Sequence, residues 1–147
     1  MNNDWQKNIL QTDEQIADLL KDTKTIAVVG IKMEAFQPAF YVPQYMKNAG
    51  FEIVPMPVYY PDATEILGEK VYRKLTDIPQ EIDLVNIFRR SNDVPKHTED
   101  ILAKHPKAVW MQSGISNAEV AETLAKAGIK VVQNLCLMVE HRALGDR

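Results

Sequence analysis

Glycine and basic residues follow two apolar runs that have the pattern of buried strands. Gly30 ends the first run, and Lys32 comes two residues later. Arg89 and Arg90 directly follow the third run. A backbone can approach a phosphate closely at a glycine, the helix that follows adds free N–H groups, and arginine binds phosphate bidentately. These residues predict a site for an anionic, phosphate-bearing ligand.

Each of these residues also has a purely structural interpretation. Gly30 could merely permit a turn, and Lys32 could be solvated. The two arginines could form a salt bridge with Asp93 or lie on the surface, as adjacent arginines usually do. The residues alone leave these alternatives open.

Three other apolar runs end next to residues that suit a ligand. Pro57 belongs to a proline-rich ledge after the second run, which could support an adenine ring. Gln112 and Gly114 follow the fourth run, where the glutamine offers a donor and an acceptor and the glycine allows close backbone approach. Asn134 and Cys136 follow the fifth run. We predict that all of these residues lie in loops at one edge of a sheet.

The first turn and the second strand disfavour classical NAD binding. After Gly30 the chain lacks the second and third glycines of the G-x-G-x-x-G fingerprint. An NAD site also has an acidic residue at the end of its second strand, where it binds the ribose hydroxyls. Here the strand ends in Val54–Val58, and the only nearby acid, Glu52, lies near its beginning. The ligand is therefore expected to differ from the usual dinucleotide.

Five apolar runs alternate with helical patterns, which is the signature of a parallel α/β sheet. Because each connection contains a helix or has the length of one, the strands should run parallel, with helices on both faces. The predicted fold is a Rossmann-like, doubly wound sheet in the order 3-2-1-4-5, with the ligand between the ends of strands one and four. The expected strands span residues 25–30, 51–55, 83–88, 108–111 and 129–132.

The whole chain, residues 1–147, is predicted to form one domain because its length suits a single core. Residues 1–24 form a lead-in helical segment, in which Thr12–Gln15 has the pattern of a capping box. The N-terminus lacks the pattern of a signal peptide, and no apolar run approaches the roughly 20 residues that span a bilayer. A cytoplasmic protein without membrane contact is therefore expected.

Charge, cysteine and histidine content argue against further function classes. The net charge is −3 with no long block of like charge, so non-specific nucleic-acid binding is not expected. The single cysteine, Cys136, cannot form an internal disulfide, and the three scattered histidines give no metal-ligand spacing. No combination of nucleophile, base and orienting residue can be assembled, so we predict neither catalytic residues nor a metal site.

Six segments form a joint pattern that is more specific than any one of them. They are Ile26–Gly30, Leu67–Tyr72, Leu75–Pro79, Phe88–Ser91, Val109–Ile115 and Cys136–Arg142. This pattern resembles the small stand-alone CoA-binding proteins and the CoA-binding domain of the succinyl-CoA synthetase α subunit. The resemblance implies a Rossmann-like fold that holds CoA or an acyl-CoA at the strand ends. The phosphorylated histidine of the synthetase lies in a part that this chain lacks, so ligase activity is not implied.

The resemblance also implies contacts for particular residues. The loop Gly30–Ala39, which includes Lys32 and Pro38, is expected to bind phosphates. Other residues are expected to flank the adenosine part, namely Pro57, Phe88, Arg89 and Arg90. The pantetheine end is expected to be lined by Gln112, Gly114 and the stretch from Asn134 to Cys136. At five positions the chain departs from residues usual in the family, namely Lys32, Gln37, Ala39, Tyr60 and Leu135.

Three functional hypotheses follow, of which the first is a binding protein for CoA or an acyl-CoA without catalytic machinery. The second is a protein-interaction domain on the same scaffold with a degenerate nucleotide site, because several ligand-facing positions have lost polarity. The third is a thiol or CoA redox carrier that uses Cys136, which is predicted near a helix N-terminus, a position that activates thiols. A cysteine there is more often a small buried hydrophobe. The expected partner is a small CoA ligand, and a homodimer is compatible with the sequence.

Overall fold

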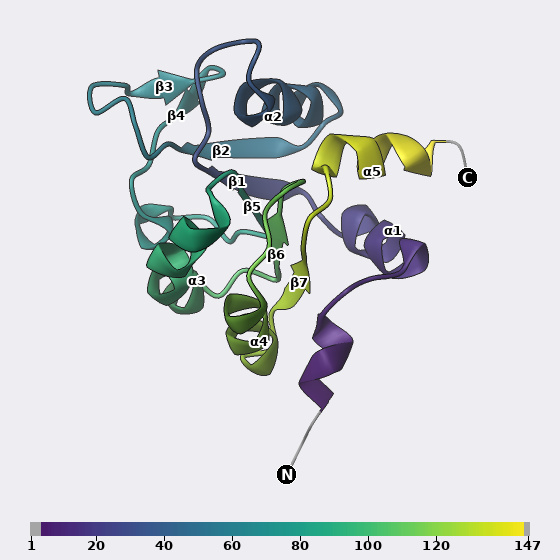
Figure 1. The fold of residues 1–147 in the computed structure, drawn as a ribbon. Helices are drawn as coiled ribbons and strands as arrows, with labels where there is room; N and C mark the ends of the chain where they lie inside the picture. The colour runs from purple at the N-terminus through teal and green to yellow at the C-terminus, as the bar shows by residue number, and fades with distance from the viewer. Residues whose placement is uncertain (1–3, 146–147) are drawn as a thin grey trace.

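The computed structural model describes residues 4–145 and contains a five-stranded parallel sheet with helices on both faces (Figure 1). The predicted Rossmann-like α/β class is therefore confirmed. The predicted domain also included residues 1–3 and 146–147, which lie outside the described residues. The strands of the sheet are β1 (Thr25–Val29), β2 (Glu52–Met56), β5 (Leu84–Ile87), β6 (Ala108–Met111) and β7 (Lys130–Val132).

Helices cover the sheet in two groups, one on each face (Figure 1). One face carries α1 (Asp13–Lys21), α2 (Pro38–Asn48) and α5 (Leu137–Leu144). The other face carries α3 (Thr98–Lys104) and α4 (Ala118–Lys126). The described chain also contains short 3-10 helices, namely η1 (Asp4–Asn8), η2 (Leu75–Asp77) and η3 (Ser91–His97).

β1 is buried along its whole length because it lies inside the sheet and both faces are covered. Ala27 and Val29 pack in the core on the α3 and α4 side, whereas Ile26 and Val28 pack in the core on the opposite side. Successive strand residues point to opposite faces, so a strand buried on both sides needs apolar residues at every position. This is why the sequence shows a continuous apolar run here instead of an alternating one.

The strands are ordered β2-β1-β5-β6-β7, or 2-1-3-4-5 in the numbering of the predicted strands, so the predicted order 3-2-1-4-5 is wrong. Pro55 gives the physical reason. The Met56 carbonyl accepts from Gly30 on the β1 side, whereas the Pro55 carbonyl accepts from Tyr72 on the other side. Strand residues alternate between the two edges, so the N–H that Pro55 lacks is missing from the outer edge of β2. A further central strand cannot pair fully there.

The corrected order also moves the place where a ligand is expected. The direction of winding now reverses between β1 and β5, and ligands of open α/β sheets bind beyond the carboxyl ends of the strands at such a point. The site predicted between strands one and four is therefore shifted by one strand. The loops after β1, β5 and β6 still meet at this edge, because β5 pairs with both neighbours in parallel.

Residues 57–83, between β2 and β5, are largely irregular and cover the free edge of β2. They include a hairpin of β3 (Glu65–Ile66) and β4 (Glu69–Lys70). Its two turn residues, Leu67 and Gly68, have φ values of 57° and 75°. Positive φ at both central residues is typical of the tight hairpin turns that match strand twist.

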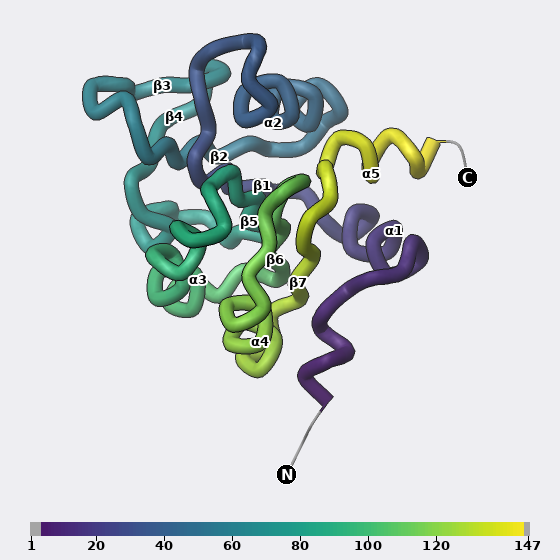
Figure 2. The backbone as a smooth tube through the Cα atoms, in the orientation of Figure 1, coloured from purple at the N-terminus to yellow at the C-terminus, as the bar shows by residue number. Residues whose placement is uncertain are grey.

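The N-terminal segment packs against the last strand of the sheet (Figure 2). The Leu10 N–H donates to the Val131 carbonyl at 2.8 Å. The predicted capping box is confirmed, because Thr12 Oγ1 accepts from the Gln15 N–H at 3.1 Å and Gln15 Oε1 accepts from the Thr12 N–H at 3.0 Å. These bonds fix where α1 begins and how the lead-in segment enters the fold.

Candidate functional site

A cleft of about 630 Å³ lies at the carboxyl edge of the sheet, at the ends of β1, β5 and β6. We call it the carboxyl-edge cleft. It occupies the switch point between β1 and β5, where the corrected strand order places a ligand. Seven of the residues predicted from the sequence line it, namely Lys32, Pro38, Phe88, Arg89, Arg90, Gln112 and Gly114.

A cleft of similar size, about 650 Å³, lies at the opposite, amino edge of the sheet. Its most connected side chain is Asp83, which accepts from the N–H groups of Lys24 and Thr25 and pairs with Lys107 at 3.2 Å. Burial opposes ionisation, but these bonds and Lys107 together hold the pKa of Asp83 below its ordinary value. Asp83 therefore has a structural role, because it links the residues at the starts of β1 and β6. The carboxyl-edge cleft is the better candidate for ligand binding.

Gly30 is buried at the end of β1, next to the carboxyl-edge cleft but not in its lining, and a side chain would not fit at its position. Its φ is +85°, a left-handed conformation that side chains disfavour. A Cβ atom built on Gly30 would lie 2.2 Å from the carbonyl oxygen of Phe88. The chain needs glycine here because the end of β1 passes directly against the end of β5.

The loop after Gly30 is attached to the first turn of α2. Pro43 lies inside α2 and has no N–H to donate to the Ala39 carbonyl four residues earlier. That carbonyl instead accepts from the Lys32 N–H at 3.1 Å. The Ala39 N–H has no partner among the described residues, and Pro38 at the first helical position has none to offer. The N-terminus of α2 thus presents a free donor in the lining of the cleft.

Lys32 is held at the cleft by the loop that follows β2. Its Nζ lies 4.1 Å from the centre of the Tyr59 ring, a cation–π contact. Tyr59 lines the same cleft and belongs to a loop whose carbonyls accept from Arg73. The guanidinium of Arg73 donates to the carbonyls of Pro57, Tyr59, Tyr60 and Ala63. Arg73 therefore organises the loop and, through Tyr59, positions the Lys32 ammonium.

A second contact joins the same two loops. The Tyr60 hydroxyl donates to the carboxylate of Glu34 and accepts from the Met33 N–H at 3.2 Å. The bond from Tyr60 holds the pKa of Glu34 below its ordinary value. Burial, followed by the bond to Glu34, raises the pKa of Tyr60. This bridge connects the glycine loop to the loop that follows β2.

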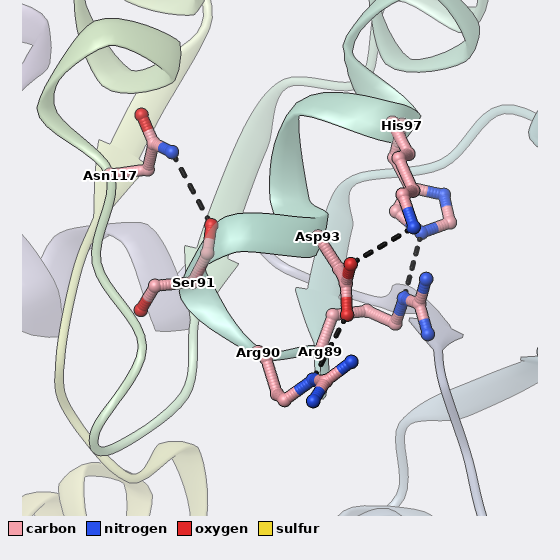
Figure 3. Close-up of polar contacts among 7 residues, drawn as sticks. Arg89, Arg90, Ser91, Asp93, His97 and Asn117 are labelled. Carbon is pink, nitrogen blue, oxygen red and sulfur yellow. Dashed lines mark hydrogen bonds and ion pairs between the residues drawn. The ribbon is translucent and has the colours of Figure 1, made fainter.

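Arg90 forms a salt bridge with Asp93, which was the structural alternative to ligand binding for this residue. It pairs with Asp93 at 3.2 Å (Figure 3). Lys96 pairs with the same carboxylate at 3.0 Å. Hydrogen bonds from Lys96 and then Arg90 hold the pKa of Asp93 below its ordinary value. The side chain of Arg90 is nevertheless 88% exposed, so its guanidinium remains accessible to an anion in the cleft.

Arg89 has a different partner and a more buried position. Its Nε donates to Nε2 of His97 at 3.2 Å (Figure 3). Burial, and then the positive charge of Arg89, lower the pKa of His97, while Asp100 and Asp93 act in the opposite direction. A neutral imidazole accepts at one nitrogen and carries its proton on the other, so His97 has its proton on Nδ1. Arg89 is also one of the residues that line the cleft.

The lowered pKa of His97 predicts a loss of stability in mild acid. The unfolded chain takes up this proton near the ordinary value of 6.5, and the folded chain only at lower pH. The stability is thus fully present above 6.5, and it is lost as the pH falls from there through the lower pKa of the folded state. Between about pH 7.5 and pH 5.5, the free energy of unfolding should fall more in the wild type than in His97→Gln. Parallel curves in urea titrations would contradict this assignment. Asp93 and Glu34 act only at lower pH, where carboxylates titrate.

Gln112 and Asn134 hold the far wall of the cleft. Gln112 Oε1 accepts from Asn86 Nδ2 at 3.3 Å and from the Leu137 N–H at 3.2 Å, while its Nε2 has no partner within the described chain. Asn134 Oδ1 accepts from the Gly114 N–H at 2.6 Å. Gln112 therefore connects β5 to the start of α5 and also lines the cleft. Asn134 supports Gly114 from behind and does not itself line the cleft.

Residues 24–142 match the family model described as a CoA binding domain. The chain belongs to the CoA-binding domain family. The Bacillus subtilis protein YneT is 35% identical over 127 residues, which cover 86% of this chain and 92% of YneT. A solved structure from Thermus thermophilus is 36% identical, has a TM-score of 0.84, and covers 91% of this chain and 99% of its own. The predicted family is therefore confirmed.

A larger enzyme contains a related segment. The ADP-forming acetate–CoA ligase II of Archaeoglobus fulgidus is 31% identical over 118 residues, which cover 74% of this chain and 17% of the ligase. This segment relates the CoA-binding domain to the CoA-binding part of an acyl-CoA synthetase that is similar to succinyl-CoA synthetase, as the sequence resemblance implied. Because the match covers only 17% of the ligase, most of the ligase lies outside the matched segment.

The five positions that differ from the usual residues of the CoA-binding domain family fall into two groups. Lys32, Gln37 and Ala39 line the carboxyl-edge cleft. Tyr60 forms the bridge to Glu34 described above, and Leu135 packs against the core. The first group therefore changes the lining of the cleft, whereas the second group makes contacts within the fold.

Four predicted residues lie outside the lining of the cleft, namely Gly30, Pro57, Asn134 and Cys136. Pro57 borders a neighbouring cleft on the α3 side. Cys136 is half-buried at the N-cap of α5 and packs against the core beneath that helix. The structure therefore brings together the residues that follow β1, β5 and β6, and leaves Cys136 to one side.

Sequence reasoning missed three residues that shape the site, namely Tyr59, Arg73 and His97. Tyr59 positions Lys32, Arg73 organises the loop after β2, and His97 accepts from Arg89. The only local signal was the turn chemistry around Tyr60 and Pro61. Their roles come from contacts between segments that are distant in the sequence, which residue spacing does not reveal.

No helix within residues 4–145 has the length and apolar character needed to cross a membrane. Within the same residues, no group of three or more His, Cys, Asp or Glu side chains is arranged to hold a metal ion.

Proposed function

We propose that the chain binds CoA or an acyl-CoA in the carboxyl-edge cleft without catalysing a reaction on it. The observation that carries this proposal is the convergence of three cations, Lys32, Arg89 and Arg90, in the lining of one cleft at the carboxyl edge of the sheet. The lining contains three cations against one carboxylate, whereas the whole chain has a net charge of −3. An anionic ligand is therefore favoured at this place. Membership of the CoA-binding domain family supports CoA as that ligand.

The diphosphate of CoA fits the side of the cleft formed by the glycine loop. The free N–H of Ala39 at the start of α2 and the ammonium of Lys32 are donors for its oxygens. Arg89 is the opposing cation across the cleft. Gly30 contributes indirectly, because the absence of a side chain lets the end of β1 pass against Phe88 and brings the glycine loop to this edge of the sheet.

The rest of CoA is proposed to extend in two directions from the diphosphate. Phe88, which is half-buried, and Pro57 offer apolar surface to the adenosine part. Gln112 and Gly114 line the wall proposed for pantetheine, where the Gln112 Nε2 is a free donor. We further propose that the protein acts in the cytoplasm with a small-molecule partner, on the basis of its single cysteine and CoA-type site.

Thermal denaturation with CoA, acetyl-CoA, ATP, NAD and NADP side by side tests the proposal. A ligand that binds only the folded chain raises Tm. Stabilisation by CoA and acetyl-CoA, with little effect of NAD or NADP, is the expected result. Failure of both CoA compounds to shift Tm at millimolar concentration would overturn the proposal. A rise in Tm with NAD alone would mean that the loop after Gly30 binds a dinucleotide and not CoA.

Substitutions in the cleft should weaken CoA binding without unfolding the protein. Lys32→Ala and Arg89→Ala are each expected to raise Kd by the equivalent of about 1–3 kcal/mol, because each removes a charge-assisted hydrogen bond. Isothermal titration calorimetry measures the change. Lys130→Ala is the matched control, since Lys130 is exposed at the opposite edge of the sheet. If both cleft variants bind CoA with wild-type affinity, the phosphates lie elsewhere.

Exposed apolar side chains beside the glycine loop support a protein-interaction function as a second candidate. Phe36 is 78% exposed, and Met33 and Tyr59 are also exposed. Grouped exposed apolar residues are typical of contact surfaces. Tight CoA binding to the isolated chain would argue against this candidate. The Cys136 redox hypothesis predicts a CoA adduct in intact-mass spectra that disappears in Cys136→Ala, and an unchanged adduct would eliminate it.

A further inference from the structure

A second cleft, of about 570 Å³, adjoins the carboxyl-edge cleft on the side of α3. We call it the side cleft. Two contacts join residues of one lining to residues of the other, and we call them the wall between the clefts; Figure 3 shows the contact of Arg89 with His97. Arg89 lines the carboxyl-edge cleft and donates at 3.2 Å to His97, which lines the side cleft. Asp93 lines the first cleft and pairs at 3.0 Å with Lys96, which lines the second. A ligand that fills the first cleft can therefore extend past this wall into the second.

The side cleft has an unpaired cation. Lys74 is exposed and has no partner among the described residues. The other cations are engaged, because Arg73 donates to four carbonyls and Lys96 pairs with Asp93. Lys74 is thus the charge that a ligand group can reach without displacing another contact.

The acidic residues of the side cleft do not cancel this charge. The carboxylate of Asp100 accepts from the Leu75 N–H at 2.7 Å and from the Thr76 N–H at 3.3 Å, which fixes the segment that carries Lys74. Glu99 is exposed and is the other carboxylate in the lining. The lining residues therefore contain three cations and two carboxylates. Asp100 positions Lys74 through the backbone.

His97 adds a neutral donor to the side cleft. Its Nε2 accepts from Arg89, so the neutral ring carries its proton on Nδ1. That nitrogen has no partner within residues 4–145. An ammonium and an imidazole N–H along one cleft suit a phosphomonoester, which presents several acceptor oxygens and a charge near −2.

We propose that the side cleft binds the phosphomonoester on the ribose of CoA, the 3′-phosphate, with Lys74 as its cationic contact and His97 as a neutral donor. This inference rests on the proposed CoA-binding function. It explains how the chain selects CoA among adenine nucleotides that share a diphosphate. NAD and ADP carry the diphosphate but have no phosphate to place in the side cleft. The side cleft therefore confers selectivity, whereas the carboxyl-edge cleft binds the group that these ligands share.

Titration calorimetry with CoA and 3′-dephospho-CoA tests the inference. Wild-type protein should bind CoA about tenfold more tightly than 3′-dephospho-CoA, and Lys74→Gln should lose about that factor for CoA alone. The affinity of Lys74→Gln for 3′-dephospho-CoA should equal that of the wild type. Lys130→Gln is the control, because it removes the same charge from an exposed lysine at the amino edge. It should retain the wild-type preference.

The possible outcomes separate this inference from the proposed function. Equal wild-type affinity for the two ligands would overturn the side-cleft assignment and leave CoA binding intact. The side-cleft assignment would also be overturned if Lys74→Gln lowered the affinity for both ligands equally, because the lysine would then not contact the 3′-phosphate. If neither ligand binds the wild-type protein, the proposed function fails and the inference fails with it.

Discussion

Gly30→Ala is expected to lower the free energy of unfolding by about 2–5 kcal/mol, the largest effect of any small substitution at the site. A left-handed alanine costs about 1–2 kcal/mol, and forcing an extra methyl group into packed structure costs about 1–3 kcal/mol more. The second term arises because the new Cβ would lie 2.2 Å from the Phe88 carbonyl oxygen, which belongs to the backbone and cannot rotate away. Urea denaturation followed by circular dichroism measures the loss.

Gly128→Ala provides the matched control for Gly30→Ala. Gly128 has a nearly identical φ of +88°, but a Cβ there meets no atom within 4 Å. Only the conformational cost of about 1–2 kcal/mol should therefore remain. Equal losses in the two variants would show that the contact with Phe88 relaxes freely, and that the close approach of β1 and β5 is not a constraint. Any Gly30→Ala protein that still folds should also bind CoA more weakly, because the phosphate loop must shift.

Trp110→Ala is expected to cost about 3–5 kcal/mol in the free energy of unfolding. Trp110 lies in the middle of the sheet, is fully buried, and packs in the core beneath α1, α2 and α5. Its Nε1 also donates to the Leu135 carbonyl at 2.8 Å. The substitution therefore leaves a large cavity and an unpaired carbonyl in the loop that leads to α5. Thermal and urea denaturation should both report the loss.

Trp110→Phe separates the two parts of this effect. Phenylalanine keeps most of the apolar ring but has no N–H, so the Leu135 carbonyl loses its donor at a cost of about 1–3 kcal/mol. Trp5→Ala is a control at the surface, because Trp5 is only partly buried in η1. If Trp110→Ala proves no more damaging than Trp5→Ala, the assigned core position of Trp110 is wrong.

Local patterns predicted the elements of the fold because their causes are local. The continuous apolar run of β1 and the reciprocal bonds of the Thr12 capping box involve residues that are neighbours in the sequence. The strand order was predicted incorrectly because it depends on which edges can pair. The signal was present in Pro55, whose missing N–H makes β2 an edge strand, but its meaning depends on which side of the strand it faces.

The same distinction holds for the site. Lys32 and Arg89 could be placed from the sequence, because residues that follow parallel strands meet at one edge of the sheet. Their partners could not. Tyr59 contacts Lys32 across 27 residues of chain, and His97 accepts from Arg89 through the turn of η3. Nor could the sequence show that Cys136 lies beside the cleft and not in it.

The sequence by itself determined the fold class, the family and the edge of the sheet that carries the candidate site. These follow from hydrophobic periodicity and from residue types at strand ends, which are properties of short segments. Only the tertiary structure decided the strand order and the division into two clefts. It also decided the pairing of Arg89 with His97, which defines the wall between them. Such features depend on edges and side chains that come together from distant segments, so their energies exist only once the chain has folded.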